Sequence, residues 1–331
     1  MTKERKSDHI ELAFNAQENT VDNRFSFEPF LAAHPNEKLK PIPFLDKTLQ
    51  TPIWISSMTG GTEKAFHINE NLAKACKQFG MGMGLGSCRP LLESKDRLAD
   101  FDFRKTIGND LPFFANLGIA QIEYLLDNNA TNKIVDLVNL LEADGLIVHV
   151  NPLQEWLQPE GDVILHPPIE TIKRLIEKVN FKIIVKEVGQ GFGYESLKQL
   201  MLLPIDAIEF AAHGGTNFAK LELLRTTTQN QNTYEALAYI GHQANEMTVF
   251  ANTLIDELKD KALCTNFIIS GGIKNFLDGY YYTQKLNSNA IYGQASTLLK
   301  YAEQSYEALE AYIISQIKGL QLANAFLTIK K

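Results

Sequence analysis

Residues 145–186, GLIVHVNPLQEWLQPEGDVILHPPIETIKRLIEKVNFKIIVK, decide the fold. Two short apolar runs, 145–150 and 182–186, lie on either side of residues 168–179, where apolar residues recur with the period of a helix. Neither run alternates apolar with polar residues, so each is expected to be a strand of a parallel sheet that is covered on both faces. The stretch is typical of a strand, a helix and a second, parallel strand.

The same unit recurs along the chain of 331 residues. Apolar or β-branched runs occur at 52–56, 82–86, 112–116, 145–150, 182–186, 207–210, 267–270 and 290–292. Segments of helical period separate most of them, at 63–79, 132–142, 168–179, 196–202 and 274–286. Eight such units predict a single (β/α)₈ TIM barrel. A doubly wound sheet is less favoured, because the glycines of 82–86 do not have the G-x-G-x-x-G spacing.

Two regions lie outside the repeated unit. Residues 1–50 are polar and are expected to form an N-terminal extension, followed by the barrel at 51–331. Residues 211–266 are expected to be an insertion between the sixth and seventh strands. Within it, residues 226–233 (TTTQNQNT) are too hydrophilic for a core and predict a solvated or mobile loop.

Composition excludes several classes of protein. With 39 acidic and 32 basic side chains and no long basic block, the chain has no electrostatic basis for binding nucleic acid. Its three cysteines are widely spaced and predict neither a disulfide framework nor a zinc site. No segment approaches the ~20 apolar residues of a membrane span, and the first residues do not resemble a signal peptide. We therefore expect a cytoplasmic protein that is not embedded in a membrane.

The ends of the expected strands carry unusual residues. Reactive groups of such barrels stand at the C-terminal ends of the strands. Five of these ends combine small residues with hydrogen-bonding side chains: 56–61 (SSMTGG), 86–89 (GSCR), 116–118 (NLG), 149–155 (HVNPLQE) and 186–189 (KEVG). Together they predict the floor of a site for a large planar polar ligand.

Glycines follow the seventh and eighth strands, at 270–272 (SGG) and 293–295 (GQA). Glycine allows backbone N–H groups to approach an anion, and the N-terminus of the following helix favours negative charge. One such pair of glycines alone indicates only a tight turn. Two loops at these positions of a barrel indicate a phosphate site.

Single side chains leave alternatives open. Lys186 ends an apolar run and needs an anionic or electron-rich partner, either a bound cofactor or an ion pair with Glu187 or Glu209. His149 is either a core side chain or a ligand-binding one. Glu155 is the best candidate for Mg²⁺, which takes few carboxylates and completes its shell with water and substrate phosphate. Cys88 has no neighbour that would activate it and is interpreted as packing.

The leader contains Arg5, Lys6 and His9 within one or two helical turns. They are interpreted either as a solvated terminus or as a basic arm that binds an anion.

Taken together, these strings resemble the type 2 isopentenyl-diphosphate Δ-isomerases, flavoenzymes with an FMN-binding (β/α)₈ barrel. The shared strings are R-K-x-x-H (5–9), S-M-T-G-G (57–61), G-S-x-R (86–89), N-L-G (116–118), H-x-N-x-L-Q-E (149–155), K-E-V-G-x-G (186–191), G-G-T (214–216) and S-G-G-I (270–273). The chain departs from the family at Cys88, where glutamine is usual, and at residues 212–216, where the family has G-x-G-G-T.

The resemblance implies the cofactors and the residues that bind them. FMN would contact Met58, Thr59, Ser87, Asn116, Lys186 and Thr216, with its phosphate at Gly271, Gly272, Gly293, Gln294 and Ala295. Isopentenyl diphosphate would contact Arg5, Lys6, His9, Arg89, His149, Asn151 and Gln154, with Gln154 and His149 nearest the reacting carbons and Glu155 on Mg²⁺. NADPH would keep the flavin reduced, and a homo-oligomer is expected.

The implied reaction converts isopentenyl diphosphate to dimethylallyl diphosphate, with reduced FMN as acid and base. No pairing of side chains in the sequence is obviously placed to protonate an alkene. Two other functions remain open at this point. One is an FMN-dependent oxidoreductase of the 2-hydroxy-acid oxidase type, and the other is a catalytically silent ligand-binding barrel.

Overall fold

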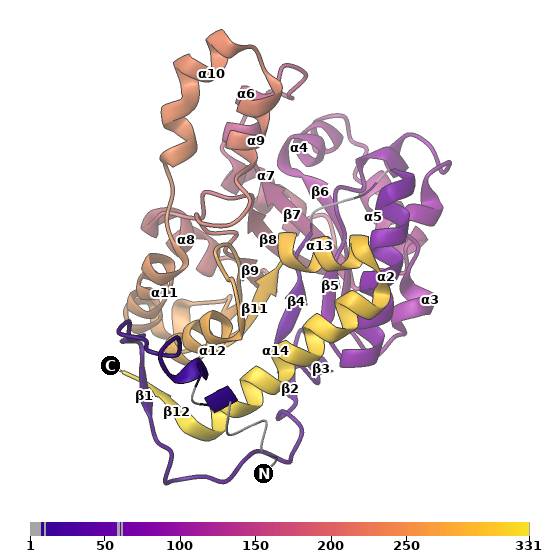
Figure 1. Ribbon diagram of the computed structural model, residues 1–331. Helices are drawn as coiled ribbons and strands as arrows, with labels where there is room; N and C mark the ends of the chain where they lie inside the picture. Colours follow the sequence, from indigo (N-terminus) through magenta and orange to yellow (C-terminus); the bar gives the residue numbers. More distant parts are fainter. Residues whose placement is uncertain (1–7, 10, 58–59, 61, 331) are drawn as a thin grey trace.

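The centre of the molecule is a closed barrel of eight parallel strands (Figure 1). The computed structural model describes residues 8–9, 11–57, 60 and 62–330. The barrel strands are β4 (Ile53–Ile55), β5 (Gly82–Gly84), β6 (Phe113–Gly118), β7 (Gly145–Val150), β8 (Lys182–Glu187), β9 (Ala207–Glu209), β10 (Asn266–Ile269) and β11 (Asn289–Gln294). β11 pairs with β4, Gly293 opposite Trp54, which closes the barrel. The (β/α)₈ prediction is confirmed, because each expected run overlaps one of these eight strands.

Helices surround the barrel and bury its outer face. The longer ones are α2 (Glu63–Phe79), α4 (Ile119–Asp127), α5 (Asn132–Leu140), α7 (Pro168–Ile176), α8 (Tyr194–Met201), α11 (Ala244–Leu258), α12 (Phe276–Lys285), α13 (Ser296–Gln304) and α14 (Tyr306–Phe326). Local chemistry sets their ends. In α2, the Thr62 side chain accepts from the N–H of Ala65, and Gly80 ends the helix with a φ of 63°.

Shorter helical pieces fill the connections. They are η1 (Arg89–Leu92), η2 (Leu98–Asp100), α3 (Arg104–Ile107), α6 (Pro152–Leu157), α9 (Phe218–Arg225), α10 (Thr228–Tyr234), η3 (Glu235–Tyr239) and η4 (Lys259–Lys261). No helix among those described is both long and apolar enough to cross a membrane.

Residues 211–266 contain two different structures. α11 packs against α8 and α12, which is the place of an ordinary barrel helix between β9 and β10. α9, α10 and η3 instead project from the barrel together with α6 (Figure 1). A separate apolar cluster of Leu157, Ala219, Leu223 and Ala238 holds α6, α9 and η3 together. The projecting part of the expected insertion is therefore confined to α9, α10 and η3.

The expectation of a loop at 226–233 is wrong. The hydroxyl of Thr227 accepts from the N–H of Asn230 and starts α10 at Thr228. None of the residues of α10 is buried, so the segment is solvated as expected from its composition. A hydrophilic sequence with a good N-cap has formed an exposed helix instead of a loop.

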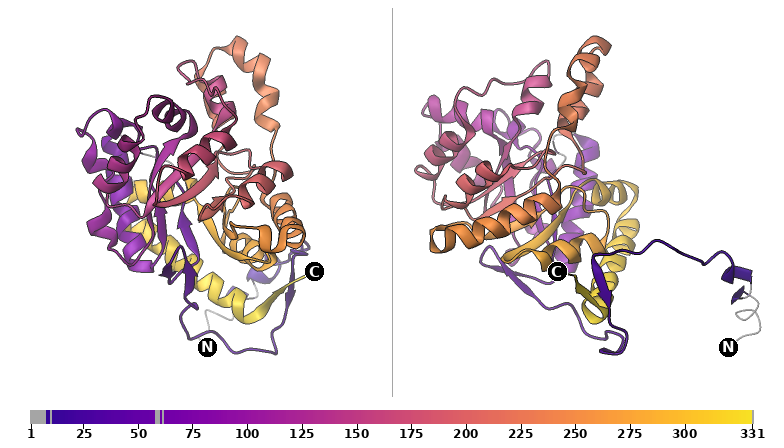
Figure 2. Two further views of the ribbon diagram at one scale, coloured as in Figure 1. Left: turned by 180° about the vertical axis from the view of Figure 1, so that it is seen from behind. Right: turned by 90° about the vertical axis from the view of Figure 1, so that its left-hand side faces the viewer.

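The N-terminal extension is attached at the end of the barrel where the strands begin. β2 (Ile42–Phe44) and β3 (Lys47–Leu49) form a hairpin, with Leu45 and Asp46 at φ values of 54° and 61° in its turn. β1 (Phe25–Phe27) pairs with β12 (Leu327–Ile329) in antiparallel fashion. The described residues that precede β1, here called the arm, reach away from the barrel (Figure 2).

Candidate functional site

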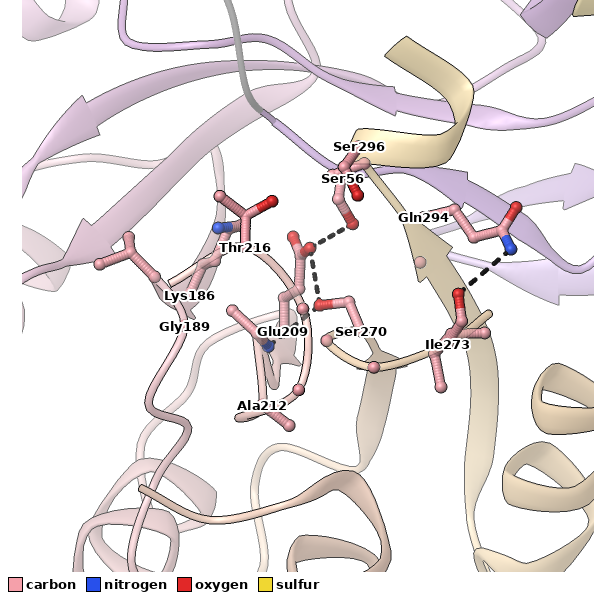
Figure 3. Close-up of a pocket in the computed structure, with 18 of the residues that line it drawn as sticks. Ser56, Lys186, Gly189, Glu209, Ala212, Thr216, Ser270, Ile273, Gln294 and Ser296 are labelled. Atoms are coloured by element: carbon pink, nitrogen blue, oxygen red, sulfur yellow. Dashed lines mark hydrogen bonds between the residues drawn. The ribbon is translucent and has the colours of Figure 1, made fainter. Parts of the chain in front are cut away.

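A pocket opens at the C-terminal ends of β4, β8, β9, β10 and β11 (Figure 3). Seven of the residues predicted to bind the cofactor line it: Lys186, Thr216, Gly271, Gly272, Gly293, Gln294 and Ala295. Ser87 follows β5 and Asn116 lies within β6, and neither is among the lining residues of the pocket. Met58 and Thr59 lie outside the described residues. The structure thus brings most of the predicted cofactor residues into one pocket.

The loop after β10 needs its glycines. Gly271 has a φ of 87°, and a Cβ placed there would lie 2.1 Å from the carbonyl oxygen of Ala212. Gly272 has a φ of 76° but more room, since its nearest neighbour, Gly214, would lie at 3.6 Å. The backbone of this loop therefore packs directly on residues 212–215 at the pocket wall. Residues 212–216, where the sequence differs from the family pattern G-x-G-G-T, are therefore the residues that contact this loop.

The first residues of α13 form another part of the wall. Ser296 and Thr297 line the pocket directly after Ala295. The Gln294 side chain is turned to structural partners, because Nε2 donates to Ile273 O (3.4 Å) and Oε1 accepts from the Tyr312 hydroxyl (3.0 Å). The backbone of 293–295 and the N-terminus of α13 are therefore left to face a ligand, an arrangement that favours an anion such as phosphate.

Glu209 is the most buried charged residue of the pocket and was missed as a pocket residue by the sequence analysis. Its Oε1 accepts from Ser56 Oγ at 2.5 Å and from Ser270 Oγ at 3.0 Å (Figure 3). Its Oε2 is buried and has no hydrogen-bond partner among the described residues. A buried acceptor without a partner is costly. A hydroxyl or N–H group of a bound ligand would satisfy it, which fits the sugar-alcohol chain of FMN.

Lys186 is 6% exposed, and its Nζ donates to Glu187 O at 2.9 Å. The alternative of an ion pair with Glu187 or Glu209 is not realised among the described residues, since no such pair lies within 4.0 Å. Glu187 instead accepts through Oε2 from the N–H groups of residues 188–191, at 2.6–2.9 Å. Burial raises the pKa of Glu187, and these backbone donors oppose the rise. The ammonium of Lys186 is left facing the pocket, as an electron-rich cofactor requires.

A second group of polar side chains follows β7. Asn151 Nδ2 donates to Glu155 Oε1 at 2.9 Å and to Gln154 Oε1 at 3.2 Å. Both Asn151 and Glu155 are buried, and α6 begins between them with Pro152 at its first position. The structure therefore brings three residues of the H-x-N-x-L-Q-E string together, as their spacing in one helical turn requires.

The carboxylate of Glu155 can bind Mg²⁺ only if a substrate supplies further ligands to the ion. Each carboxylate oxygen already accepts one hydrogen bond, Oε1 from Asn151 and Oε2 from the N–H of Asp162 at 2.8 Å. An ionised carboxylate oxygen has a second lone pair, so metal binding remains possible. One carboxylate with water and substrate phosphates is a common Mg²⁺ environment. The residues present fit the ion in that form.

Arg89 and Gln154 each have a carboxylate partner that the sequence did not predict. Arg89 Nη1 contacts Asp162 Oδ2 at 2.6 Å. Gln154 Nε2 donates to Glu222 Oε1 at 3.4 Å, and Glu222 on α9 is 2% exposed. Partners so far apart in the sequence cannot be recognised from the spacing of residues within a motif. Glu222 is therefore a further candidate for the site.

His149 is held by its neighbour on β6. Its Nδ1 lies 2.7 Å from Asn116 Oδ1, while Asn116 Nδ2 donates to Leu85 O at 2.9 Å. The amide oxygen of Asn116 must then accept, so His149 carries a proton on Nδ1. Burial, with a smaller contribution from Lys186, lowers the pKa of His149 to about 3. Nε2 of the neutral His149 therefore presents a lone pair and not a proton.

We expect this pKa to make stability depend on pH. Below pH 6.5 the unfolded chain binds a proton at His149 that the folded protein binds only near pH 3, so stability falls as the pH is lowered through this window. Between pH 6.5 and pH 5 the loss is up to about 2 kcal/mol. Urea unfolding at both pH values, in the wild type and in His149→Asn, measures it. An equal pH dependence in the two proteins would contradict this assignment.

Neither Cys88 nor the described part of the basic arm lies at the pocket. Arg5 and Lys6 lie outside the described residues, and His9 is exposed on the arm that reaches away from the barrel (Figure 2). None of the described residues of the arm lines the pocket. Cys88 is fully buried, and burial raises the pKa of its thiol to about 12, in line with packing.

Comparison with known proteins gives close relatives in sequence and distant ones in structure. No family model matches the chain. It is 35% identical over 341 aligned residues to the isopentenyl-diphosphate delta-isomerase of Rickettsia felis, covering 99% of this chain and 94% of the relative. A flavocytochrome b2 variant with sulfite bound superposes with a TM-score of 0.63 at 13% identity, over 91% of this chain and 72% of that one. A mandelate oxidase variant with an FMN adduct gives 0.55 at 10% identity, over 99% and 98%.

Proposed function

Because the chain belongs to the type 2 isopentenyl-diphosphate Δ-isomerase family, we propose that it converts isopentenyl diphosphate to dimethylallyl diphosphate with FMN and Mg²⁺. The observation that carries the proposal is the adjacency of two polar groups at one end of the barrel. Lys186 of the pocket lies on β8 directly beside His149 of β7, and the Asn151, Gln154 and Glu155 group follows β7. An FMN site and a site for a metal-bound diphosphate would therefore share a border.

The residues of the pocket would hold the flavin. In this proposal Lys186 faces the electron-rich side of the ring system, Thr216 and Glu209 bind its polar groups, and the loops at 271–272 and 293–295 bind its phosphate. Ser87, Asn116, Met58 and Thr59 remain proposed contacts on the side of β4 to β6. When bound and reduced, with NADPH as reductant, FMN would supply the acid and the base for moving the double bond.

The polar group after β7 would hold the substrate. Arg89, Asn151 and Gln154 offer donors to the diphosphate, and Glu155 would bind Mg²⁺ on it. His149 lies beside Lys186 in the pairing of β7 with β8, and in this proposal Gln154 and His149 orient the alkene. The Glu222 carboxylate accepts from Gln154 Nε2 and thereby fixes which end of this amide faces the substrate.

The arm enters the proposal through a second subunit. Arg5, Lys6 and His9 would bind the diphosphate, but the described residues of the arm lead away from the pocket of their own barrel (Figure 2). We therefore propose a homo-oligomer in which the arm reaches the site of a neighbouring subunit. A cytoplasmic location is proposed on the basis of the composition.

The test is an anaerobic assay with isopentenyl diphosphate, FMN, Mg²⁺ and NADPH. We expect dimethylallyl diphosphate to form without net consumption of NADPH, and the activity to disappear when FMN or Mg²⁺ is left out. A preparation that gains no flavin colour on incubation with FMN, or forms no allylic product, would contradict the proposal.

The fold also supports a second candidate, an FMN-dependent oxidoreductase of the 2-hydroxy-acid oxidase type. The superposition on a mandelate oxidase favours it at the level of the barrel. This function requires net electron transfer and has no use for Glu155. Reduction of the bound flavin by lactate or mandelate under anaerobic conditions, without formation of an allylic product, would favour it over the isomerase.

A further inference from the structure

The turn at residues 158–162 connects the two sides of the proposed substrate site. Glu160 pairs with Arg225 at 2.8 Å, and Arg225 pairs with Glu222 at 2.7 Å, beside Gln154. On the other side, Asp162 contacts Arg89 and Glu155. The turn therefore touches, directly or through one residue, the groups proposed to bind alkene, diphosphate and metal.

Asp162 makes three contacts with this site. Its Oδ2 accepts from Arg89 Nη1 at 2.6 Å and from Gln121 Nε2 at 2.7 Å. Its backbone N–H donates to Glu155 Oε2 at 2.8 Å. A single residue thus holds both the guanidinium proposed for the diphosphate and the carboxylate proposed for the metal.

The pairing leaves most of the guanidinium available. The guanidinium of Arg89 has five N–H donors, and Asp162 is its only side-chain partner among the described residues. The Arg89 side chain is 49% exposed, so an unpaired guanidinium there would move freely. Asp162 fixes one edge of it and leaves other donors free for a phosphate, which arginine binds best with two parallel hydrogen bonds.

Gly161 fixes the position of the Asp162 backbone. A Cβ at residue 161 would lie 1.9 Å from the carbonyl oxygen of Glu155 and 2.8 Å from its carbonyl carbon. The turn therefore packs against the backbone of α6 more closely than any other residue allows. This contact brings the N–H of Asp162 to the Glu155 carboxylate.

We propose that Asp162 is a positioning residue that orients Arg89 and Glu155 together, so that diphosphate and Mg²⁺ bind to one preformed unit. This inference rests on the proposed function. Metal-binding carboxylates are commonly oriented by hydrogen bonds of this kind, and losing such a bond weakens metal binding about 10- to 100-fold.

The first experiment measures binding of inorganic pyrophosphate with Mg²⁺ to the FMN-loaded protein by calorimetry. Asp162→Ala keeps the backbone N–H but removes the partner of Arg89, and we expect binding about fivefold weaker, the upper range for a partly exposed ion pair. Asp136→Ala, on the exposed face of α5, is the matched control and should leave binding unchanged.

A double-mutant cycle separates positioning from general destabilisation. If Asp162 acts through Arg89, then Asp162→Ala should have almost no effect on pyrophosphate binding in an Arg89→Ala background. Equal effects in both backgrounds would overturn the inference for Arg89. A wild-type protein that binds no pyrophosphate would instead overturn the proposed function itself.

The contact with Glu155 has its own test. Gly161→Ala should push the turn away from α6 and raise the Mg²⁺ concentration for half-maximal pyrophosphate binding about 10-fold. Gly193→Ala is the control, because its Cβ would meet only the side chain of His242, at 3.3 Å or more. An unchanged Mg²⁺ requirement in Gly161→Ala would overturn this part of the inference.

Discussion

Replacing Glu155 by glutamine is expected to lower isomerase activity by about 100-fold or more and to abolish its response to Mg²⁺. The change keeps the size of the side chain and an oxygen that accepts from Asn151 or Asp162, but it removes the charge. Because Glu155 is the only carboxylate proposed for the metal, a neutral amide leaves Mg²⁺ with the diphosphate and water alone.

The measurement is initial rate against Mg²⁺ concentration in the anaerobic assay. Glu93→Gln is the matched control, since Glu93 is an exposed carboxylate near Arg89 and its loss changes the net charge equally. FMN content should be equal in all three proteins. Full activity in Glu155→Gln would contradict the metal role, and an oxidase would also be unaffected by this change.

Gly271→Ala is expected to lower the free energy of unfolding by about 3 kcal/mol, whereas Gly272→Ala lowers it by about 1 kcal/mol. Both residues have a positive φ, which costs alanine about 1 kcal/mol or slightly more. Only at Gly271 does the added Cβ also overlap the backbone of Ala212, at 2.1 Å from its oxygen and 2.3 Å from its nitrogen. Backbone atoms cannot move aside as the end of a side chain can.

Urea unfolding of the two variants and the wild type in the absence of FMN measures this difference. Gly271→Ala and Gly272→Ala are controls for each other. Both place alanine at a positive φ, but only at residue 271 does the added Cβ overlap backbone atoms. FMN titration of the same proteins shows whether the loop also binds the cofactor phosphate, in which case Gly271→Ala should bind FMN more weakly than Gly272→Ala. Equal stabilities would show that the 212–271 contact relaxes freely.

The barrel could be predicted because its information is local. Strands buried on both faces leave uninterrupted apolar runs, and 182–186 or 112–116 can be recognised without knowing what packs on them. The residues at the ends of such strands can also be found without tertiary information, and Lys186 and the loop at 270–272, which line the pocket, are of this kind.

Contacts between distant residues could not be predicted. Glu209 stands in the apolar run 207–210, but nothing local shows that Ser56 and Ser270 bind one of its oxygens and leave the other free. Asp162 lies in a polar stretch that resembles any surface turn, and its partners Arg89 and Gln121 are 73 and 41 residues away in the sequence. Such partners become visible only when the strands are placed side by side.

The pairing of β1 with β12 has a consequence for biosynthesis. Phe25 lies opposite Ile329, so β1 and β12 are far apart in the sequence and β1 is synthesised long before β12. While the ribosome is working, the barrel can assemble progressively from its neighbouring β/α units, but β1 has no partner strand until β12, which follows all eight barrel strands, has been made. Attachment of the arm is therefore a late event, and nascent chains pass through a stage with a nearly complete barrel and an undocked leader.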